Sequence, residues 1–406
     1  MLRPMERRAW IALGLTYLCA CGGASEGDGT AEDPEDPTGT SGASTGAASS
    51  TAADATTAAD GTSTGPGIDP FDGEPLDVPA DGAWHFVEID GMACNGGAQS
   101  GVGVRRVEGA QRLVLYFKGG GACFNNLTCS FTAPLMLTGD DAMAANPDGV
   151  LDFSRDDNPL IDANVVYVPY CTGDVHAGIR GEQMPPGVTD PWNFVGHDNV
   201  LAALDRVVPT FPDPQQLVVL GTSAGGMGAL FNFPFIRAGW PQTQTVVIDD
   251  SGVILPDAFL HPCLQTQLRQ TWGFSELLPA DCEGCTPEDG GGLSTMFEYL
   301  PDTYPDVRFA LIASNQDQIL RLFYGFGNDG CAAASGLPDL GIDAYHDGLS
   351  ALYTESLDGR VVLYEIDSET HTWSTTPAFY TTTSGGVTMA DWFSSVLDGT
   401  AQTVRP

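Results

Sequence analysis

The stretch Leu217-Val-Val-Leu-Gly-Thr-Ser-Ala-Gly-Gly-Met-Gly-Ala-Leu230 decides the fold. Four apolar residues lead into Gly221, and small residues follow Ser223. This order is typical of a buried strand, a tight turn that carries one serine, and a closely packed helix. The serine of such a turn has an unfavourable backbone conformation, so its neighbours must be small. The N-terminus of the following helix lies beside the hydroxyl, where its N–H groups can stabilise an anion. We therefore predict that Ser223 is a nucleophile, with a glycine-rich turn in a Rossmann-like sheet as the alternative.

A glycine run after an earlier strand supplies a second part of the same pattern. Leu113-Val-Leu-Tyr-Phe117 has the composition of a central strand, and three glycines follow Lys118. Glycines let the backbone approach a substrate closely and turn its N–H groups towards it. We expect the N–H groups of Gly120 and Gly121, together with that of Ala224, to form an oxyanion hole. A structural turn is the alternative, and the lack of a following G-K-[ST] excludes a P-loop.

The rest of residues 68–406 predicts a single α/β domain. Apolar runs typical of strands lie at 84–89, 101–106, 162–169, 245–252, 307–312 and 360–366, and helical spacing lies at 192–208. Strand, helix, strand, turn and helix in succession are typical of a mostly parallel sheet flanked by helices. Residues 252–303 form an irregular insertion with cysteines, which we expect to shape the substrate site.

An acidic residue and a histidine each follow one of the late strands. Asp317 lies one short loop after 307–312, and His371 lies in a polar loop after 360–366. The order Ser, Asp, His along the chain is that of the catalytic residues in α/β-hydrolases. The competing candidates in the same part of the chain are His346 for the base and Asp347 and Asp367 for the acid.

Other acidic residues and histidines are expected to have structural roles. Asp249 and Asp250 end the strand after the serine turn, where we expect them to fix the floor of the site. Asp174 and His176 follow the strand 162–169, and loop packing is the favoured interpretation for both, with a role at the rim of a pocket as the alternative. No spacing of His, Cys, Asp or Glu predicts a metal site, and no cofactor is expected.

The N-terminus has the features of an export signal. Three arginines within residues 1–8 precede an apolar run, Ala9–Leu18, that is too short to span a bilayer. Cys21 follows a small residue three positions after a leucine, a spacing that resembles the lipobox of bacterial lipoproteins. By that resemblance residues 1–20 are a signal peptide and Cys21 carries the lipid, although Cys19 makes the site ambiguous. An ordinary secretory signal without lipid is the alternative, and both export the protein.

The composition of the mature chain restricts its partners. Residues 21–67 consist mainly of Gly, Ser, Thr, Ala, Asp and Glu, and we expect a disordered tether because they bury too little apolar surface. The formal net charge of the full sequence is −37, and removal of residues 1–20, with three arginines and one glutamate, makes the chain more acidic still. Such a surface repels phosphate backbones and polyanions, so we expect no nucleic-acid partner, and the membrane is contacted through the lipid anchor alone.

Beyond the anchor the chain has eight cysteines, at positions 94, 123, 129, 171, 263, 282, 285 and 331. An even number in an exported chain predicts up to four disulfides, and the pairing is left open apart from Cys123 with Cys129, which we favour first. Cys282 and Cys285 have the spacing that begins a zinc site, but no second pair completes it.

Taken together, the motifs resemble the pectin acetylesterase family, which includes the Notum-type carboxylesterases. The matching segments are Phe117-Lys-Gly-Gly-Gly-Ala-Cys-Phe124, Gly221-Thr-Ser-Ala-Gly-Gly226, Asp250-Ser-Gly252, Asp317-Gln318 and Thr370-His-Thr-Trp373. The resemblance implies an α/β-hydrolase fold and the roles predicted above for the serine, the acid, the base and the oxyanion hole. Family members often carry an aromatic residue where this chain has Gly121-Ala122, so we expect a reshaped acyl pocket.

The resemblance further implies a serine carboxylic-ester hydrolase, with an acetylesterase acting on polysaccharide or glycan as the first expectation. The substrates would be acylated saccharides or small esters. The alternatives are a carboxylesterase for longer acyl chains and a surface lipoprotein that binds ligands on an inactive hydrolase scaffold. A peptidase would use the same three residues.

Overall fold

The computed structural model of the chain describes residues 71–132, 148–332, 337–357 and 359–406. The predicted signal peptide, Cys21 and the predicted tether lie outside the described residues. Among the helices that are described, none is both long enough and apolar enough to cross a membrane.

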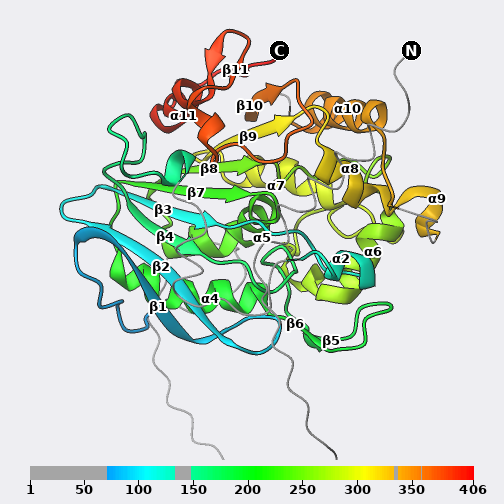
Figure 1. The fold of residues 1–406 in the computed structure, drawn as a ribbon, viewed down its shortest axis with the longest axis horizontal. Coiled ribbons are helices and arrows are strands. Elements are labelled where there is room, and N and C mark those ends of the chain that lie inside the picture. The colour runs from blue at the N-terminus through cyan, green and yellow to red at the C-terminus, as the bar shows by residue number, and fades with distance from the viewer. Residues whose placement is uncertain (1–70, 133–147, 333–336, 358) are drawn as a thin grey trace, which may run out of the picture. The chain divides into compact units, whose positions relative to one another are not determined.

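An eight-stranded sheet forms the centre of the domain (Figure 1), with the spatial order β1-β2-β4-β3-β7-β8-β9-β10. In chain order its strands are β1 (Asp81–Ala93), β2 (Gln99–Val107), β3 (Arg112–Phe117), β4 (Asn164–Val168), β7 (Gln216–Thr222), β8 (Gln244–Asp250), β9 (Arg308–Ser314) and β10 (Val361–Ile366). The pairs from β4 to β10 are parallel, and the hairpin β1–β2 is antiparallel. The mostly parallel sheet of the predicted α/β class is confirmed.

The helices lie along the sheet and around its carboxyl edge. They are α2 (Asn126–Cys129), α4 (Gly196–Thr210), α5 (Ala224–Gly239), α6 (Pro262–Trp272), α7 (Met296–Thr303), α8 (Gln318–Gly325), α9 (Asn328–Cys331), α10 (Ile342–Ala351) and α11 (Met389–Asp398). Figure 1 shows α2, α6, α8 and α9 gathered on the side towards which the parallel strands point. Two small ribbons, β5 (Gly181–Gln183) with β6 (Trp192–Phe194) and β11 (Thr383–Ser384) with β12 (Val387–Thr388), lie outside the main sheet.

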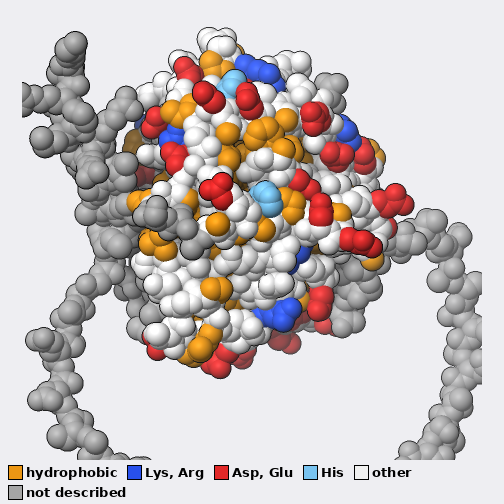
Figure 2. Space-filling model, turned by 90° about the vertical axis from the view of Figure 1, so that its right-hand side faces the viewer, with side chains coloured by type: hydrophobic (Ala, Val, Ile, Leu, Met, Phe, Trp, Pro, Cys, Tyr) orange, Lys and Arg blue, Asp and Glu red, His pale blue; other side chains and the backbone are white. Residues whose placement is uncertain are grey.

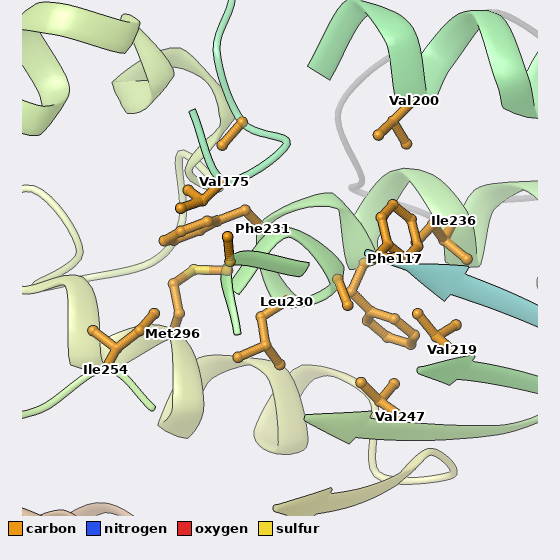
Figure 3. Close-up of a cluster of buried hydrophobic side chains, with 14 of the residues drawn as sticks. Phe117, Val175, Val200, Val219, Leu230, Phe231, Ile236, Val247, Ile254 and Met296 are labelled. Carbon is orange, nitrogen blue, oxygen red and sulfur yellow. The ribbon is translucent and has the colours of Figure 1, made fainter. Parts of the chain in front are cut away.

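The sheet is buried on both faces because successive side chains of a strand point in opposite directions. Leu115 and Phe117 of β3 belong to a core cluster with helices α4 and α5, whereas Val114 and Tyr116 belong to a second cluster with α11. Figure 3 shows the first cluster, in which Phe117 lies among side chains of β7, β8 and α5. Burial on both faces explains why these strands are continuous apolar runs rather than alternating ones.

Two sequence-based boundaries were wrong. The helix predicted over 192–208 begins only at Gly196, because Trp192–Phe194 pairs as a short strand with Gly181–Gln183, and it continues through Pro209 to Thr210. The insertion 252–303 is less irregular than predicted, since it contains α6 and α7. In the first case, tertiary pairing overrides the local helical spacing.

Four disulfides connect the eight cysteines that follow the N-terminal segment: Cys94–Cys171, Cys123–Cys129, Cys263–Cys331 and Cys282–Cys285. The predicted pair Cys123–Cys129 is confirmed. Because Cys282 and Cys285 are bonded to each other, their sulfurs are not available as the thiolate ligands of a zinc site.

Candidate active site

The turn after β7 gives Ser223 its conformation. This residue has φ 56° and ψ −124°, in a region that L residues rarely occupy, and α5 begins at the next residue. A Cβ atom at Gly221 would lie 2.1 Å from the carbonyl oxygen of Gly225, and one at Gly225 would lie 2.0 Å from that of Phe117. Glycine is therefore required on both sides of the serine, because β7, α5 and β3 approach each other there without room for side chains.

Ser223, His371 and Asp317 form a continuous chain of hydrogen bonds. The Nε2 atom of His371 lies 2.7 Å from the Oγ atom of Ser223, and its Nδ1 atom lies 2.7 Å from Oδ2 of Asp317. The three residues follow β7, β10 and β9, which lie within four successive strands of the sheet, β7-β8-β9-β10. Parallel strands present their carboxyl ends at the same edge, so loops that are distant in the sequence meet there.

Asp317 is held from its other side by the helix that follows it. Its Oδ1 atom accepts hydrogen bonds from the N–H groups of Ile319 at 2.9 Å and Leu320 at 3.0 Å, so Asp317 is the N-cap of α8. Its side chain is 1 % exposed. The cap fixes the carboxylate, which leaves Oδ2 directed at the imidazole.

The electrostatic environment favours the protonated form of His371. Burial lowers the pKa of this imidazole, but the charge and hydrogen bond of Asp317, with a further contribution from Asp250, more than offset burial and raise the pKa overall. A base that is stabilised when it takes a proton is suited to accept one from a serine hydroxyl.

Asp250 organises the loop that carries His371. Its Oδ2 atom accepts hydrogen bonds from the N–H groups of Trp373 at 2.9 Å and Ser374 at 2.7 Å and from the Ser374 hydroxyl at 2.7 Å. Its own carbonyl oxygen accepts from the N–H group of Ser223 at 2.7 Å. The buried Asp250 thus links Ser223 to Trp373 and Ser374, which follow His371 in the same loop. The sequence did not predict the contacts of Asp250 to the loop that carries His371.

The N–H groups of Gly120, Gly121 and Ala224 are available for an oxyanion. None of them donates to another group of the described residues. Gly121 and Ala224 line the same cavity as Ser223, and the N–H group of Ala224 belongs to the first turn of α5, where a helix has no internal acceptor. The helix dipole adds a partial positive charge at this end.

An apolar cavity with a mouth open to solvent leads away from Ser223. Its lining side chains are hydrophobic or aromatic except for Ser223 itself and Tyr324, whose hydroxyl donates to the carbonyl oxygen of Val253. The lining includes Met227 and Phe231 from α5, Leu264, Leu268 and Trp272 from α6, and Phe323 from α8. The insertion that contains α6 therefore forms one wall. Gly121 and Ala122 also line the cavity, so small residues form this part of its wall.

The competing candidates do not reach Ser223. His346 and Asp347 lie exposed on α10, and Asp367 is exposed and accepts from the Gln316 side chain at 2.7 Å. Asp174 is buried with His176 in the loop after β4, where its oxygens accept from Thr172 and Gly196. Figure 2 shows acidic side chains spread over one face of the molecule with hydrophobic ones between them and few basic ones.

Comparison with known proteins gives the family. The family model for Pectinacetylesterase matches residues 83–285. The chain belongs to the pectinacetylesterase family. The matched region contains Ser223 and the glycine loop and ends before Asp317 and His371.

Several carboxylesterases are similar to this pectinacetylesterase family member. The palmitoleoyl-protein carboxylesterase notum2 of Xenopus laevis is 26% identical over 182 residues, which cover 43% of this chain and 36% of that protein. The mouse palmitoleoyl-protein carboxylesterase NOTUM is 28% identical over 42% of this chain and 35% of that protein. The match thus spans little more than a third of the length of these relatives.

The fold is that of a solved relative. The crystal structure of the Wnt deacylase Notum from Drosophila superimposes with a TM-score of 0.56 and 19% sequence identity, covering 79% of this chain and 95% of that one. At this identity the comparison establishes the fold, which is the predicted α/β-hydrolase type.

Proposed function

We propose that this protein is a serine carboxylic-ester hydrolase with Ser223 as nucleophile, His371 as base and Asp317 as acid. The observation that carries the proposal is the unbroken contact from Ser223 Oγ through His371 to Asp317 Oδ2, with both hydrogen bonds at 2.7 Å. Membership in the pectinacetylesterase family supports the same reaction class.

The reaction follows from the geometry. His371 takes the proton of Ser223 as Oγ bonds the ester carbonyl carbon, and Asp317 stabilises the imidazolium that forms. The carbonyl oxygen becomes an oxyanion, which accepts hydrogen bonds from the N–H groups of Gly120, Gly121 and Ala224. The tetrahedral intermediate collapses, and His371 gives its proton to the leaving alcohol. Water then attacks the acyl-enzyme while His371 takes its proton, and the second tetrahedral intermediate releases the acid and returns the proton to Ser223.

We further propose that the acyl group is an aliphatic chain longer than acetyl. The first expectation from the sequence was an acetylesterase, but an acetyl group would occupy only the part of the cavity next to Ser223. The walls formed by α5, α6 and α8 would then enclose apolar space without contacting the substrate. The relatives named above as palmitoleoyl-protein carboxylesterases favour the same choice.

A series of acyl esters tests this assignment. Each methylene buried in an apolar site contributes about 0.8 kcal/mol, which is about fourfold in kcat/KM. We expect octanoyl esters of p-nitrophenol to exceed butyryl esters by roughly 100-fold or more, since four methylenes are added. Highest activity on the acetyl ester would overturn the proposed chain length and leave the reaction class standing.

The nucleophile is tested separately. Ser223→Ala should abolish hydrolysis and labelling by a fluorophosphonate probe, whereas Ser384→Ala, a buried serine of the β11 ribbon, should leave both unchanged. An unlabelled but folded wild type would favour the alternative of a binding lipoprotein on an inactive scaffold.

We also propose that the catalytic domain spans residues 68–406 and acts outside the cytoplasm, held by a lipid on Cys21 through the segment 21–67. Four disulfides support export, since such bonds persist in oxidising compartments. Incorporation of radiolabelled palmitate into the wild type and its loss in Cys21→Ser, with Cys19→Ser as the control, tests the anchor. Equal labelling of Cys21→Ser would refute it.

A further inference from the structure

The glycine loop that offers the oxyanion donors has little to hold it in place. Residues 119–121 have no side chains, and each peptide unit could turn about its flanking bonds. A half-turn would replace an N–H group in the site by a carbonyl oxygen, which would repel an oxyanion instead of stabilising it. The loop therefore needs fixed points on either side of the two peptide units whose N–H groups face the reaction.

The first fixed point is the peptide unit between Lys118 and Gly119, which is held at both of its polar ends. The Lys118 carbonyl oxygen accepts a hydrogen bond from Nε2 of His176 at 2.8 Å. The N–H group of Gly119 donates to the hydroxyl of Thr222, the residue directly before the nucleophile, at 3.3 Å. This unit cannot turn without losing both bonds.

The second fixed point is the carbonyl group of Gly121. It accepts a hydrogen bond from the hydroxyl of Tyr170 at 2.9 Å. The same hydroxyl oxygen accepts from the N–H group of Val175 at 2.8 Å, so its single proton is directed towards Gly121. Burial raises the pKa of Tyr170 well above its ordinary value, and the hydroxyl therefore stays a donor at every pH of interest.

His176 is equally constrained to one role. Burial lowers its pKa to about 4, so the imidazole is neutral near pH 7, and its bond to a carbonyl oxygen requires the proton to be on Nε2. The carbonyl oxygen of His176 accepts from the Asn232 side chain of α5 at 2.8 Å. The donor is thereby anchored to the helix that follows Ser223, and the glycine loop keeps its distance from the nucleophile.

We propose that Tyr170 and His176 are positioning residues of the oxyanion hole: their hydrogen bonds to Gly121 and Lys118 hold the two intervening peptide units with N–H groups towards the substrate carbonyl. The proposal rests on the proposed esterase function. It gives a role to the buried loop after β4, for which the sequence favoured packing.

The test removes each donor and compares transition-state binding with ground-state binding. Tyr170→Phe keeps the buried ring and loses the hydroxyl. Its matched control is Tyr364→Phe, because Tyr364 is also buried and its hydroxyl donates to the Val387 carbonyl at 2.7 Å, outside the glycine loop. His176→Asn removes the donor that reaches Lys118, while asparagine tolerates the φ of 57° found at this position.

The probe is the trifluoromethyl ketone with an octyl chain. Ser223 Oγ bonds its carbonyl carbon, His371 takes the hydroxyl proton, and the ketone oxygen becomes an anion in the oxyanion hole. Loss of a complete oxyanion donor typically costs 10²–10³-fold in rate, and a donor that is merely less well aimed should cost less. We expect Tyr170→Phe and His176→Asn to lower kcat by about 10- to 100-fold and to weaken the binding of the ketone by the same factor.

In both variants, inhibition by 1-octanol, which occupies the cavity without forming an oxyanion, should stay within about threefold of the wild type, as should KM. Unchanged kcat and ketone affinity in folded variants would overturn the proposal. A parallel loss of octanol affinity and thermal stability in both variants would do so as well, since it would indicate a general packing role. Failure of the esterase function itself would be visible in the wild type, which would then hydrolyse no ester.

Discussion

Replacement of Asp317 by asparagine should nearly abolish catalysis without unfolding the protein. In the wild type, Oδ1 of Asp317 caps α8 through the N–H groups of Ile319 and Leu320, and Oδ2 accepts from His371. Asparagine has one oxygen, and the two N–H donors of the helix hold it at the cap. Its NH₂ group must then face Nδ1 of His371. Because an NH₂ group only donates, Nδ1 must be unprotonated and accept the hydrogen bond.

The magnitude follows from the tautomer that this orientation imposes. His371 would accept at Nδ1 and carry its proton on Nε2, the atom 2.7 Å from Ser223 Oγ, so it could not take the serine proton. An equivalent exchange in a serine protease lowers kcat on the order of 10⁴-fold, equal to about 5 kcal/mol of barrier. Asn and Asp are nearly equivalent N-caps, so the free energy of unfolding should change by only about 1 kcal/mol.

The assay combines octanoyl ester hydrolysis with urea unfolding, and Asp367→Asn serves as the control because Asp367 is exposed after the neighbouring strand. The direction in which the pH profile of kcat/KM shifts is an independent test. Burial lowers the pKa of His371 and Asp317 raises it, so removal of that charge should move the acid limb of kcat/KM to lower pH. A variant that keeps more than a tenth of the wild-type kcat would refute the assignment of Asp317 and of the imposed tautomer.

Three further changes test the supporting structure. Asp250→Asn should lower both kcat and the free energy of unfolding, the latter by about 1–3 kcal/mol, because weaker acceptance from Trp373 and its neighbour loosens the base loop; urea titration and initial rates measure the two effects. Burial raises the pKa of Asp174 to about 6 from 3.8, so the stabilisation by its neutral form is complete below pH 3.8 and is lost as the pH rises through 6. Wild type should therefore lose about 3 kcal/mol of unfolding free energy over this range relative to Asp174→Asn, and identical pH dependence would contradict the sign. Replacing both members of Cys123–Cys129 by serine should cost about 2 kcal/mol by chain entropy, measured by the same titration, since the closed loop is short.

The serine turn was predictable because its requirements are local. A buried strand, a serine in a strained conformation and a helix without large residues at its start leave a pattern in consecutive residues around Ser223. The parallel sheet was predictable for a similar reason, because strands that are buried on both faces consist of consecutive apolar residues. The order in which Asp317 and His371 follow their strands then restricted the acid and the base to a few positions.

The contacts among those residues were decided by the tertiary structure. Nothing in the sequence near Asp250 shows that its carboxylate binds the loop more than a hundred residues later. The tyrosine and histidine that hold the glycine loop were equally hidden, since a hydrogen bond to a backbone carbonyl needs only the right position and no particular neighbour in the sequence. The helix predicted from Trp192 failed because its first residues pair with a strand instead.

The sequence by itself determined the strands of the central sheet, the candidate nucleophile and the chain order of the candidate acid and base, because each depends on short-range patterns of size and polarity. The tertiary structure alone decided how far His371 lies from Ser223, which groups bind the backbone of the glycine loop, and that the cavity beside the serine is lined by apolar side chains. Its lining side chains come from α5, α6, α8 and the glycine loop. Only the packing of these segments around one edge of the sheet brings them together, and no local sequence pattern predicts how close they lie.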